Sequence, residues 1–275
     1  MKNSQIAALV LLVWLLLFCC GCQQALVNVP TTAARPTQFS TFPSSAPATT
    51  PTHTEPSIPE TVPPEPKRII CIDAGHQQSA ITQTEPIGPG ATERKAKLSS
   101  GTQGVSTRIP EYQLNLDVSL LLEQELIARG YEVIMIRRTN DCPLSNAERA
   151  QVANESGADI FVRIHANGSD NENVSGMLCC APSLENPYLS KQVAQDSIRL
   201  SKIITQTFCA ATGANNQGLY YVDTMTGINW CQIPVTIVEM GYMSNDAEDE
   251  AMATPEYRRK MVTGIANGID AFFGD

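Results

Sequence analysis

Three short apolar runs of the β type each lead into a side chain that can take part in chemistry. Residues 69–72 are followed closely by His76, and residues 159–164 lead directly to His165. A third run ends on the carboxylate of Glu239. In an open α/β sheet, sites are built at the carboxyl ends of the strands. The sequence therefore predicts two imidazoles and one carboxylate at the same edge of a sheet.

Strands and helices alternate through residues 67–275. The clearest helix starts after Pro110 and stops before Gly130, with Leu114 and Val118 on its apolar face. We expect strands at residues 67–73, 131–136, 158–164, 175–181, 219–222 and 235–239, and further helices at residues 146–155 (capped by Asn146), 189–212 and 257–273. This alternation predicts an α/β fold: a largely parallel twisted sheet with helices on both faces, in a single catalytic domain.

Residues 1–22 have the pattern of an export signal. Lys2 precedes an uninterrupted apolar run, residues 6–18, which is short for a membrane-spanning helix and suits a signal peptide. The Gly21-Cys22 junction resembles the lipobox of bacterial lipoproteins, where the cysteine is lipidated, although Cys19 stands where that motif usually has leucine. An uncleaved N-terminal anchor is the alternative. In both cases the rest of the chain would be exported to the cell envelope and held at a membrane.

Residues 23–66 consist mainly of Pro, Thr, Ser and Ala, with few large apolar side chains. Such a segment cannot bury enough apolar surface to offset its chain entropy, so we expect a disordered linker. Its prolines favour a partly extended spacer. His53 lies inside this segment and is discounted as a metal ligand.

The remaining residues, 67–275, suit one α/β domain in length. The formal net charge of -9 argues against a nucleic acid bound through charge. An exported domain could bridge some of its cysteines, but their spacing does not select the pairs. Those within strand-like runs are expected to be buried thiols. The cysteines in this part are Cys71, Cys142, Cys179, Cys180, Cys209 and Cys231.

The segment between His76 and Glu111 is rich in Gly, Pro, Ser and Thr and has no clear periodicity. Loops of this length inside compact domains are usually functional or disordered. Because this one begins and ends at candidate site residues, we expect it to border a substrate groove.

Glu111 is the third candidate ligand. It falls in the first turn of its helix, three and seven residues before Leu114 and Val118, so it points along the inward face. The helix dipole alone would favour a carboxylate there, by at most about 1 kcal/mol. The two convergent histidines favour the ligand interpretation. Glu85 and Glu93, in the preceding loop, are weaker alternatives.

Each histidine alone could be an ordinary surface or hydrogen-bonded imidazole. Two neutral imidazoles and a carboxylate together leave zinc a fourth position for water, as in catalytic zinc sites. Water held there can ionise near neutral pH and attack a carbonyl. Glu239 suits the base that collects the proton and passes it to the departing amine. Its alternative is a core carboxylate paired with Arg149 or Arg137.

Four short motifs together resemble the zinc-dependent N-acetylmuramoyl-L-alanine amidases, the amidase-3 family of cell-wall hydrolases. They are Ile72-Asp73-Ala74-Gly75-His76, Glu111 followed by Leu114-Asn115-Leu116, Ile164-His165-Ala166-Asn167, and Glu239-Met240-Gly241-Tyr242-Met243-Ser244-Asn245. Further matches lie between them, from Arg137 to Asp141 and at Leu144, Arg149 and Ala153-Asn154. The similarity covers nearly all of residues 67–273, in the order of the family.

The resemblance implies that His76, Glu111 and His165 bind Zn²⁺ and that Glu239 is the catalytic acid. It also implies peptidoglycan as the substrate, cut at the amide that joins the lactyl group of N-acetylmuramic acid to L-alanine of the stem peptide.

The chain departs from the usual motifs of the family in several places. Ala74 replaces a usual Pro, Gln77 a usual Gly, and Arg163 a common Ser, and the gap from His76 to Glu111 is long. These departures concern the groove more than the metal, so they leave the substrate preference open.

Several polar residues are candidates for a substrate groove. Asn167, Asn154, Asn245 and the Tyr220-Tyr221 pair would contact sugar or peptide, but local backbone hydrogen bonds would explain the asparagines equally well. No pattern selects Arg163 or Arg149 for contact with a substrate carboxylate.

The leading interpretation is an exported, membrane-tethered zinc amidase acting on peptidoglycan. A wall-binding or scaffold protein that has lost catalysis would have no need of Glu239 together with all three ligands. A zinc peptidase acting on stem peptides is separated from the amidase only by the family resemblance, since both attack an amide carbonyl.

Overall fold

The computed structural model describes residues 67–274. The predicted signal or anchor with Cys22, and the predicted linker at residues 23–66, lie outside the described residues. Within the described part, no helix combines the length and the apolar character needed to cross a bilayer.

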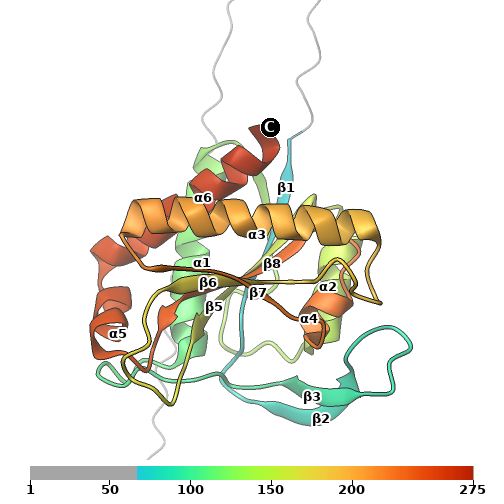
Figure 1. Ribbon diagram of the computed structural model, residues 1–275, viewed down its shortest axis with the longest axis horizontal. Coiled ribbons are helices and arrows are strands. Elements are labelled where there is room, and N and C mark those ends of the chain that lie inside the picture. Colours follow the sequence, from blue (N-terminus) through green and yellow to red (C-terminus); the bar gives the residue numbers. More distant parts are fainter. Residues whose placement is uncertain (1–66, 275) are drawn as a thin grey trace, which may run out of the picture. The chain divides into compact units, whose positions relative to one another are not determined.

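A six-stranded sheet forms the centre of the domain, in the order β4-β1-β5-β8-β6-β7 (Figure 1). Strands β4, β1, β5 and β8 run parallel to one another, β6 is antiparallel to β8, and β7 is parallel to β6. The largely parallel sheet predicted from the sequence is therefore confirmed, with β6 and β7 reversed. The strands are β1 (Ile69–Ala74), β4 (Glu132–Met135), β5 (Ile160–Asn167), β6 (Met177–Ala181), β7 (Asn216–Tyr221) and β8 (Val235–Tyr242).

Helices cover both faces of this sheet. The long helices α1 (Glu111–Ala128), α3 (Lys191–Thr212) and α6 (Pro255–Gly274) pack on one face, over the larger hydrophobic core. The shorter α2 (Asn146–Glu155) and α4 (Thr226–Asn229) cover the other face, over a smaller core.

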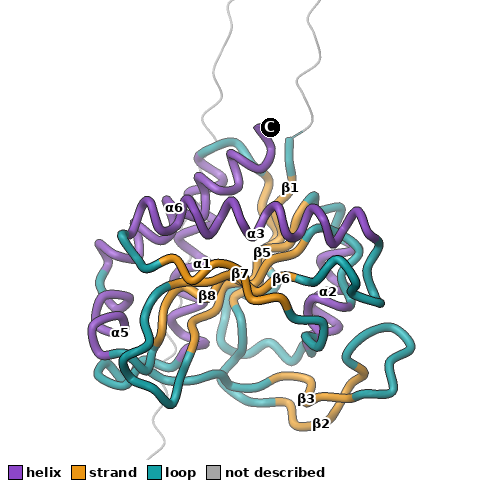
Figure 2. Tube along the Cα trace, viewed as in Figure 1, coloured by secondary structure: helices purple, strands orange, loops and turns teal. Residues whose placement is uncertain are grey.

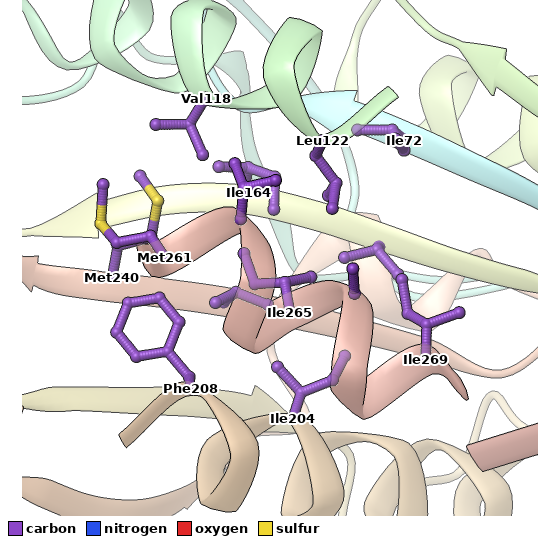
Figure 3. Close-up of a cluster of buried hydrophobic side chains, with 14 of the residues drawn as sticks. Ile72, Val118, Leu122, Ile164, Ile204, Phe208, Met240, Met261, Ile265 and Ile269 are labelled. Atoms are coloured by element: carbon purple, nitrogen blue, oxygen red, sulfur yellow. The ribbon is translucent and has the colours of Figure 1, made fainter. Parts of the chain in front are cut away.

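The two cores follow from the alternation of side chains along each strand. On β1, Ile70 and Ile72 face the larger core, whereas Cys71 faces the smaller one. Figure 3 shows how Ile265 of α6 fills the space between Leu122 of α1 and the α3 helix. Full burial of one such side chain stabilises the fold by roughly 1.5–3 kcal/mol.

The segment between His76 and Glu111 is more regular than expected. It contains an antiparallel hairpin, β2 (Ile81–Pro86) and β3 (Arg94–Leu98), which stands apart from the main sheet (Figure 2). Most side chains of both strands are exposed, so the sequence lacks the alternation that reveals a half-buried strand. Tertiary contacts hold the hairpin instead, including a hydrogen bond from Trp230 Nε1 to the carbonyl of Pro86 (3.0 Å).

Three local expectations also need correction. Helix α2 is capped by Ser145 rather than by Asn146, because Ser145 and Glu148 form a reciprocal capping box. Helix α5 (Asp246–Ala253), which Asn245 caps, was not expected, and neither was α4. Strands β5 and β8 continue beyond His165 and Glu239, so these two residues lie within strands.

The cysteines of the described part are all free thiols. Cys71, Cys179 and Cys180 lie in strands and are buried, as expected for structural thiols. Cys142 and Cys231 lie outside the strands and are buried as well. Burial raises the pKa of the Cys71 and Cys180 thiols well above the usual range, so both stay protonated.

Candidate active site

His76, Glu111 and His165 meet at the carboxyl edge of the parallel strands. One potential ligand atom from each of the three residues lies within 4.8 Å of the other two. His76 follows β1, His165 lies near the end of the adjacent β5, and Glu111 begins α1. Parallel pairing of β1 with β5 places both histidines at the same edge. The arrangement predicted from the three sequence positions is present in the fold.

The Glu111 carboxylate lies between the two imidazoles. Its Oε1 is 3.1 Å from Nε2 of His76 and 3.3 Å from Nδ1 of His165. Asn115, one turn later on α1, donates to Oε1 from its side-chain amide (3.2 Å), and the backbone N–H of Thr102 donates to Oε2 (2.9 Å). These bonds fix the orientation of a carboxylate that is only 3% exposed.

His76 is held by the segment that follows the hairpin. Its Nδ1 lies 2.9 Å from the carbonyl oxygen of Ser99 and 3.0 Å from the Ser99 hydroxyl. The backbone of His76 has φ of 60°, a conformation that is uncommon outside glycine. A side chain on the preceding Gly75 would lie 2.2 Å from the ring of His165, so only glycine lets the two histidines approach.

The protonation states suit a cation. Burial disfavours a charged Glu111, but hydrogen bonds with His165 and His76 outweigh it and hold the pKa of Glu111 well below its usual range. Burial lowers the pKa of His165 to about 4, despite its hydrogen bond with Glu111. At neutral pH the site therefore offers a carboxylate and a neutral imidazole, which are the forms that bind metals.

The set of donor atoms tests whether a metal fits this site. Nε2 of His76 and Nδ1 of His165 both face Oε1 of Glu111. The other ring nitrogen of His165, Nε2, is buried against Gly75. Two histidines and one carboxylate form a donor set found in catalytic zinc sites. The residues present thus fit a zinc ion.

Glu239 lies beside the cluster on the next strand. It is paired with His165 across the β5–β8 ladder and is partly buried. Burial, together with the charge of Glu111, raises the pKa of Glu239 to about 8, although Arg163 acts in the opposite direction. A carboxyl group with a raised pKa can both hold and release a proton near neutral pH.

Glu239 forms no ion pair with Arg149 or Arg137. Arg149 instead pairs with the buried Asp73 (Nη1 to Oδ1, 2.8 Å), and Arg137 donates to the carbonyls of Ala74 and Gly75. The alternative that placed Glu239 in a core salt bridge with these two arginines is therefore wrong.

Three of the other residues considered from the sequence lie outside the site. Glu85 accepts a hydrogen bond from the backbone of Ala147, and Glu93 is exposed on the hairpin, so neither belongs to the cluster. Asn154 bonds to the backbone of Trp230 and Gln232, as the local alternative proposed.

Two cavities border the histidines and Glu239. Asn167 lines the wider of these cavities, whereas Asn245 caps α5. Tyr220 and Tyr221 are exposed and line neither cavity. Of the proposed groove residues, Asn167 alone is placed beside the site.

Two residues that orient the candidate ligands had no role in the expectations from sequence, although Asn115 stands within one of the family motifs. For Asn115 the sequence offers one signal: it is a polar residue one turn after Glu111 on an otherwise apolar helix face. Ser99 gave none, because its contact with His76 depends on how the chain returns from the hairpin.

Comparisons with known proteins agree with this geometry. Residues 70–271 match the model of the Amidase_3 family, N-acetylmuramoyl-L-alanine amidase. An N-acetylmuramoyl-L-alanine amidase of Mycobacterium tuberculosis is 28% identical over 214 residues, covering 74% of this chain and 86% of that protein.

Solved structures show the same fold. The amidase Ami1 from Mycobacterium smegmatis superposes with a TM-score of 0.68 and 28% identity, covering 75% of this chain and 97% of that one. The catalytic domain of the amidase CwlV from Bacillus (Paenibacillus) polymyxa superposes with a TM-score of 0.60 and 25% identity, and the match covers 75% of this chain and 98% of that one. Both structures are cell-wall amidases, and both share the α/β fold of this chain. The chain belongs to the Amidase_3 family of N-acetylmuramoyl-L-alanine amidases.

Replacement of a candidate ligand tests the metal centre. His165→Ala removes one of three ligands, so we expect the zinc content of the purified protein to fall from about one equivalent to a small fraction of it. Elemental analysis of the purified protein measures the zinc content per chain. His53→Ala, the same change at the histidine discounted from the sequence, is the control. Unchanged zinc in His165→Ala would remove this residue from the centre.

Proposed function

We propose that this protein is an exported, membrane-tethered zinc hydrolase that cleaves the amide between N-acetylmuramic acid and L-alanine in peptidoglycan. The observation that carries the proposal is the convergence of His76, Glu111 and His165 beside Glu239 at one sheet edge. Membership of the Amidase_3 family supports the choice of bond.

In this proposal, His76, Glu111 and His165 are the three protein ligands of the metal. A bound zinc ion would polarise the scissile carbonyl and lower the pKa of water to near neutrality. Asn115 and the Thr102 N–H keep the Glu111 carboxylate oriented toward the imidazoles. The hydrogen bond with Ser99 fixes the orientation of the His76 ring. The chain thus supplies a preorganised ligand set, which lowers the cost of reaching the reactive geometry.

Glu239 moves the proton. Its carboxylate accepts the proton of the attacking water, and its carboxylic acid form donates that proton to the nitrogen of the departing L-alanine. Its raised pKa suits this exchange, because neither form is strongly favoured near neutral pH. Its place on β8, opposite His165, sets it beside the ligands without making it one of them.

The N-terminal segments supply the proposed location. A signal ending at Cys22 would deliver the chain to the cell envelope, and lipidation of that cysteine would hold it at the membrane. Residues 23–66 would then act as a spacer that lets the catalytic domain reach the wall. An uncleaved N-terminal anchor would give the same placement without lipid.

A digest of purified peptidoglycan tests the reaction. The zinc-loaded protein should release stem peptides that begin with a free L-alanine amine, which amine labelling and mass spectrometry detect. Cleavage confined to bonds inside the stem would instead indicate a zinc peptidase. Absence of any cleavage, with zinc bound, would indicate a wall-binding protein that lacks catalysis.

Glu239→Gln separates proton transfer from metal binding. The amide keeps the shape of the side chain but cannot accept the proton, so we expect kcat to fall by about 10²–10⁴-fold while zinc content stays unchanged. Glu93→Gln, on the exposed hairpin, serves as the matched control. Activity of Glu239→Gln near that of the wild type would show that another group moves the proton.

Metabolic labelling tests the tether. Cells that express the full chain should incorporate labelled fatty acid into it, and Cys22→Ala should abolish this label. Cys20→Ala, two residues earlier, should keep it. A wild-type chain that stays with the membrane but carries no label would establish the uncleaved anchor.

A further inference from the structure

A second feature beside the site is a cavity of about 240 Å³ between the hairpin, α2 and the segment around α4. It shares His76, His165 and Glu239 with the wider cavity, so the two cavities meet where the reacting amide would lie. Its remaining wall is partly apolar, with Leu98 and Met225 among the lining residues. Two cations, Arg163 and Lys95, also line it.

Arg163 carries a donor that the fold leaves unused. Its side chain is 3% exposed and donates to Asp73 through Nε (2.9 Å) and to Asn146 through Nη2 (2.7 Å). Nη1 has no acceptor among the described residues, although Arg163 lines the cavity. Nη1 is not one of the fully buried polar atoms without a partner, so it is open to the cavity and can donate to a ligand there.

The charge around Arg163 is also unbalanced. Asp73 is a single buried carboxylate, and it pairs with both Arg149 and Arg163. In these ion pairs two guanidinium groups share the one negative charge of Asp73. A second anion entering the cavity would complete the pairing, and a carboxylate is the anion whose geometry a guanidinium matches best.

Glycine at position 227 fixes how the guanidinium lies. A side chain there would stand 1.7 Å from Nη1 of Arg163 and 2.5 Å from its Cζ, so the backbone of α4 packs directly on the guanidinium. This contact holds Arg163 in place at the cavity wall.

Lys95 adds a second cation, from the hairpin. It lies on the exposed strand β3, and its Nζ donates to the carbonyl of Thr224 (2.9 Å). Both residues line the cavity, so this bond lies at its wall. A carboxylate in the cavity would be a stronger acceptor than the neutral carbonyl that Lys95 now contacts.

The wider cavity has the opposite character. Asp170 and Glu111 line it, together with Thr102, Asn167 and Ser244. Its polar groups suit the hydroxyl and acetamido groups of a sugar, and none of its lining residues is a Lys or Arg that could pair with an anion. The two sides of the site thus differ in charge, as a substrate with an uncharged sugar and an acidic peptide requires.

We propose that the cavity lined by Arg163 and Lys95 binds the free α-carboxylate of the acidic residue that follows L-alanine in the stem peptide. In stem peptides this residue is a γ-linked D-glutamate, whose α-carboxyl is either free or amidated. Arg163 and Lys95 then determine specificity, selecting the free acid over the amide. This inference rests on the proposed amidase function, because that reaction places the peptide at this cavity.

Calorimetry with short peptides tests the subsite without turnover. L-alanyl-D-glutamate with its γ-carboxyl blocked as an amide should bind the zinc-loaded protein about tenfold more tightly than the same dipeptide with the α-carboxyl amidated as well, as expected for a lost charge-assisted hydrogen bond. Equal affinities would overturn the proposal. A tripeptide that is amidated at the second residue but carries a free carboxylate on the third should bind as weakly as the amide. If it binds as tightly as the acid, the assignment to the second residue is wrong.

Variants connect the preference to the two cations. Lys95→Met should reduce the preference for the acid to about threefold or less, whereas Lys97→Met, which removes a charge from the same strand away from the cavity, should retain it. Arg163→Lys keeps a cation for Asp73 but withdraws Nη1, so a folded Arg163→Lys protein should also lose the preference. An unchanged preference in both Lys95→Met and Arg163→Lys would contradict the assignment.

Kinetics on muramyl dipeptides separate this inference from the proposed function. With N-acetylmuramyl-L-alanyl-D-glutamate and its α-amide, the wild type should show a difference of about tenfold in KM and little difference in kcat. Cleavage of both at equal kcat/KM would overturn the subsite and leave the amidase intact. Cleavage of neither would reject the amidase, and the calorimetric comparison would still decide the subsite.

Discussion

The parallel pairing of β1, β5 and β8 is the constraint on which the rest of the structure depends. Parallel strands deliver their carboxyl ends to one edge, so His76, His165 and Glu239 arrive together although they are far apart in the chain. The helix that follows β1 must begin at this same edge, and this brings Glu111 between the imidazoles. Apolar packing on both faces holds the sheet, and the polar groups needed for chemistry are confined to its end.

A second layer of charge lies directly beneath this edge. Asp73, one strand position from the end of β1, binds Arg149 and Arg163, and Arg137 donates to the carbonyls of Ala74 and Gly75. Breaking a buried pair of this kind typically costs about 3–5 kcal/mol, because one charge is left without a partner. These contacts fix the backbone that leads to His76, so the buried charges and the candidate metal centre form one connected structure.

Much of the fold and of the candidate site could be predicted where local pattern and burial agree. Helix α1 begins at Glu111 as expected, because Pro110 and the apolar spacing mark its start and its inward face. The β2–β3 hairpin could not be predicted, since its strands expose most of their side chains and are held by distant partners such as Trp230. The pairing of Arg149 with Asp73 was equally hidden, because these residues are far apart in sequence.

The sequence by itself determined the alternation of strands and helices, the positions of the two histidines and Glu111 at or near element ends, and the resemblance to a family of amidases. Hydrophobic periodicity and motif spacing are local properties, so they can be read along the chain. The tertiary structure alone decided the reversal of β6 and β7 and which anion Arg149 meets. It also decided that Arg163 keeps a donor free at a cavity wall. These depend on which distant surfaces meet, and no local pattern records that.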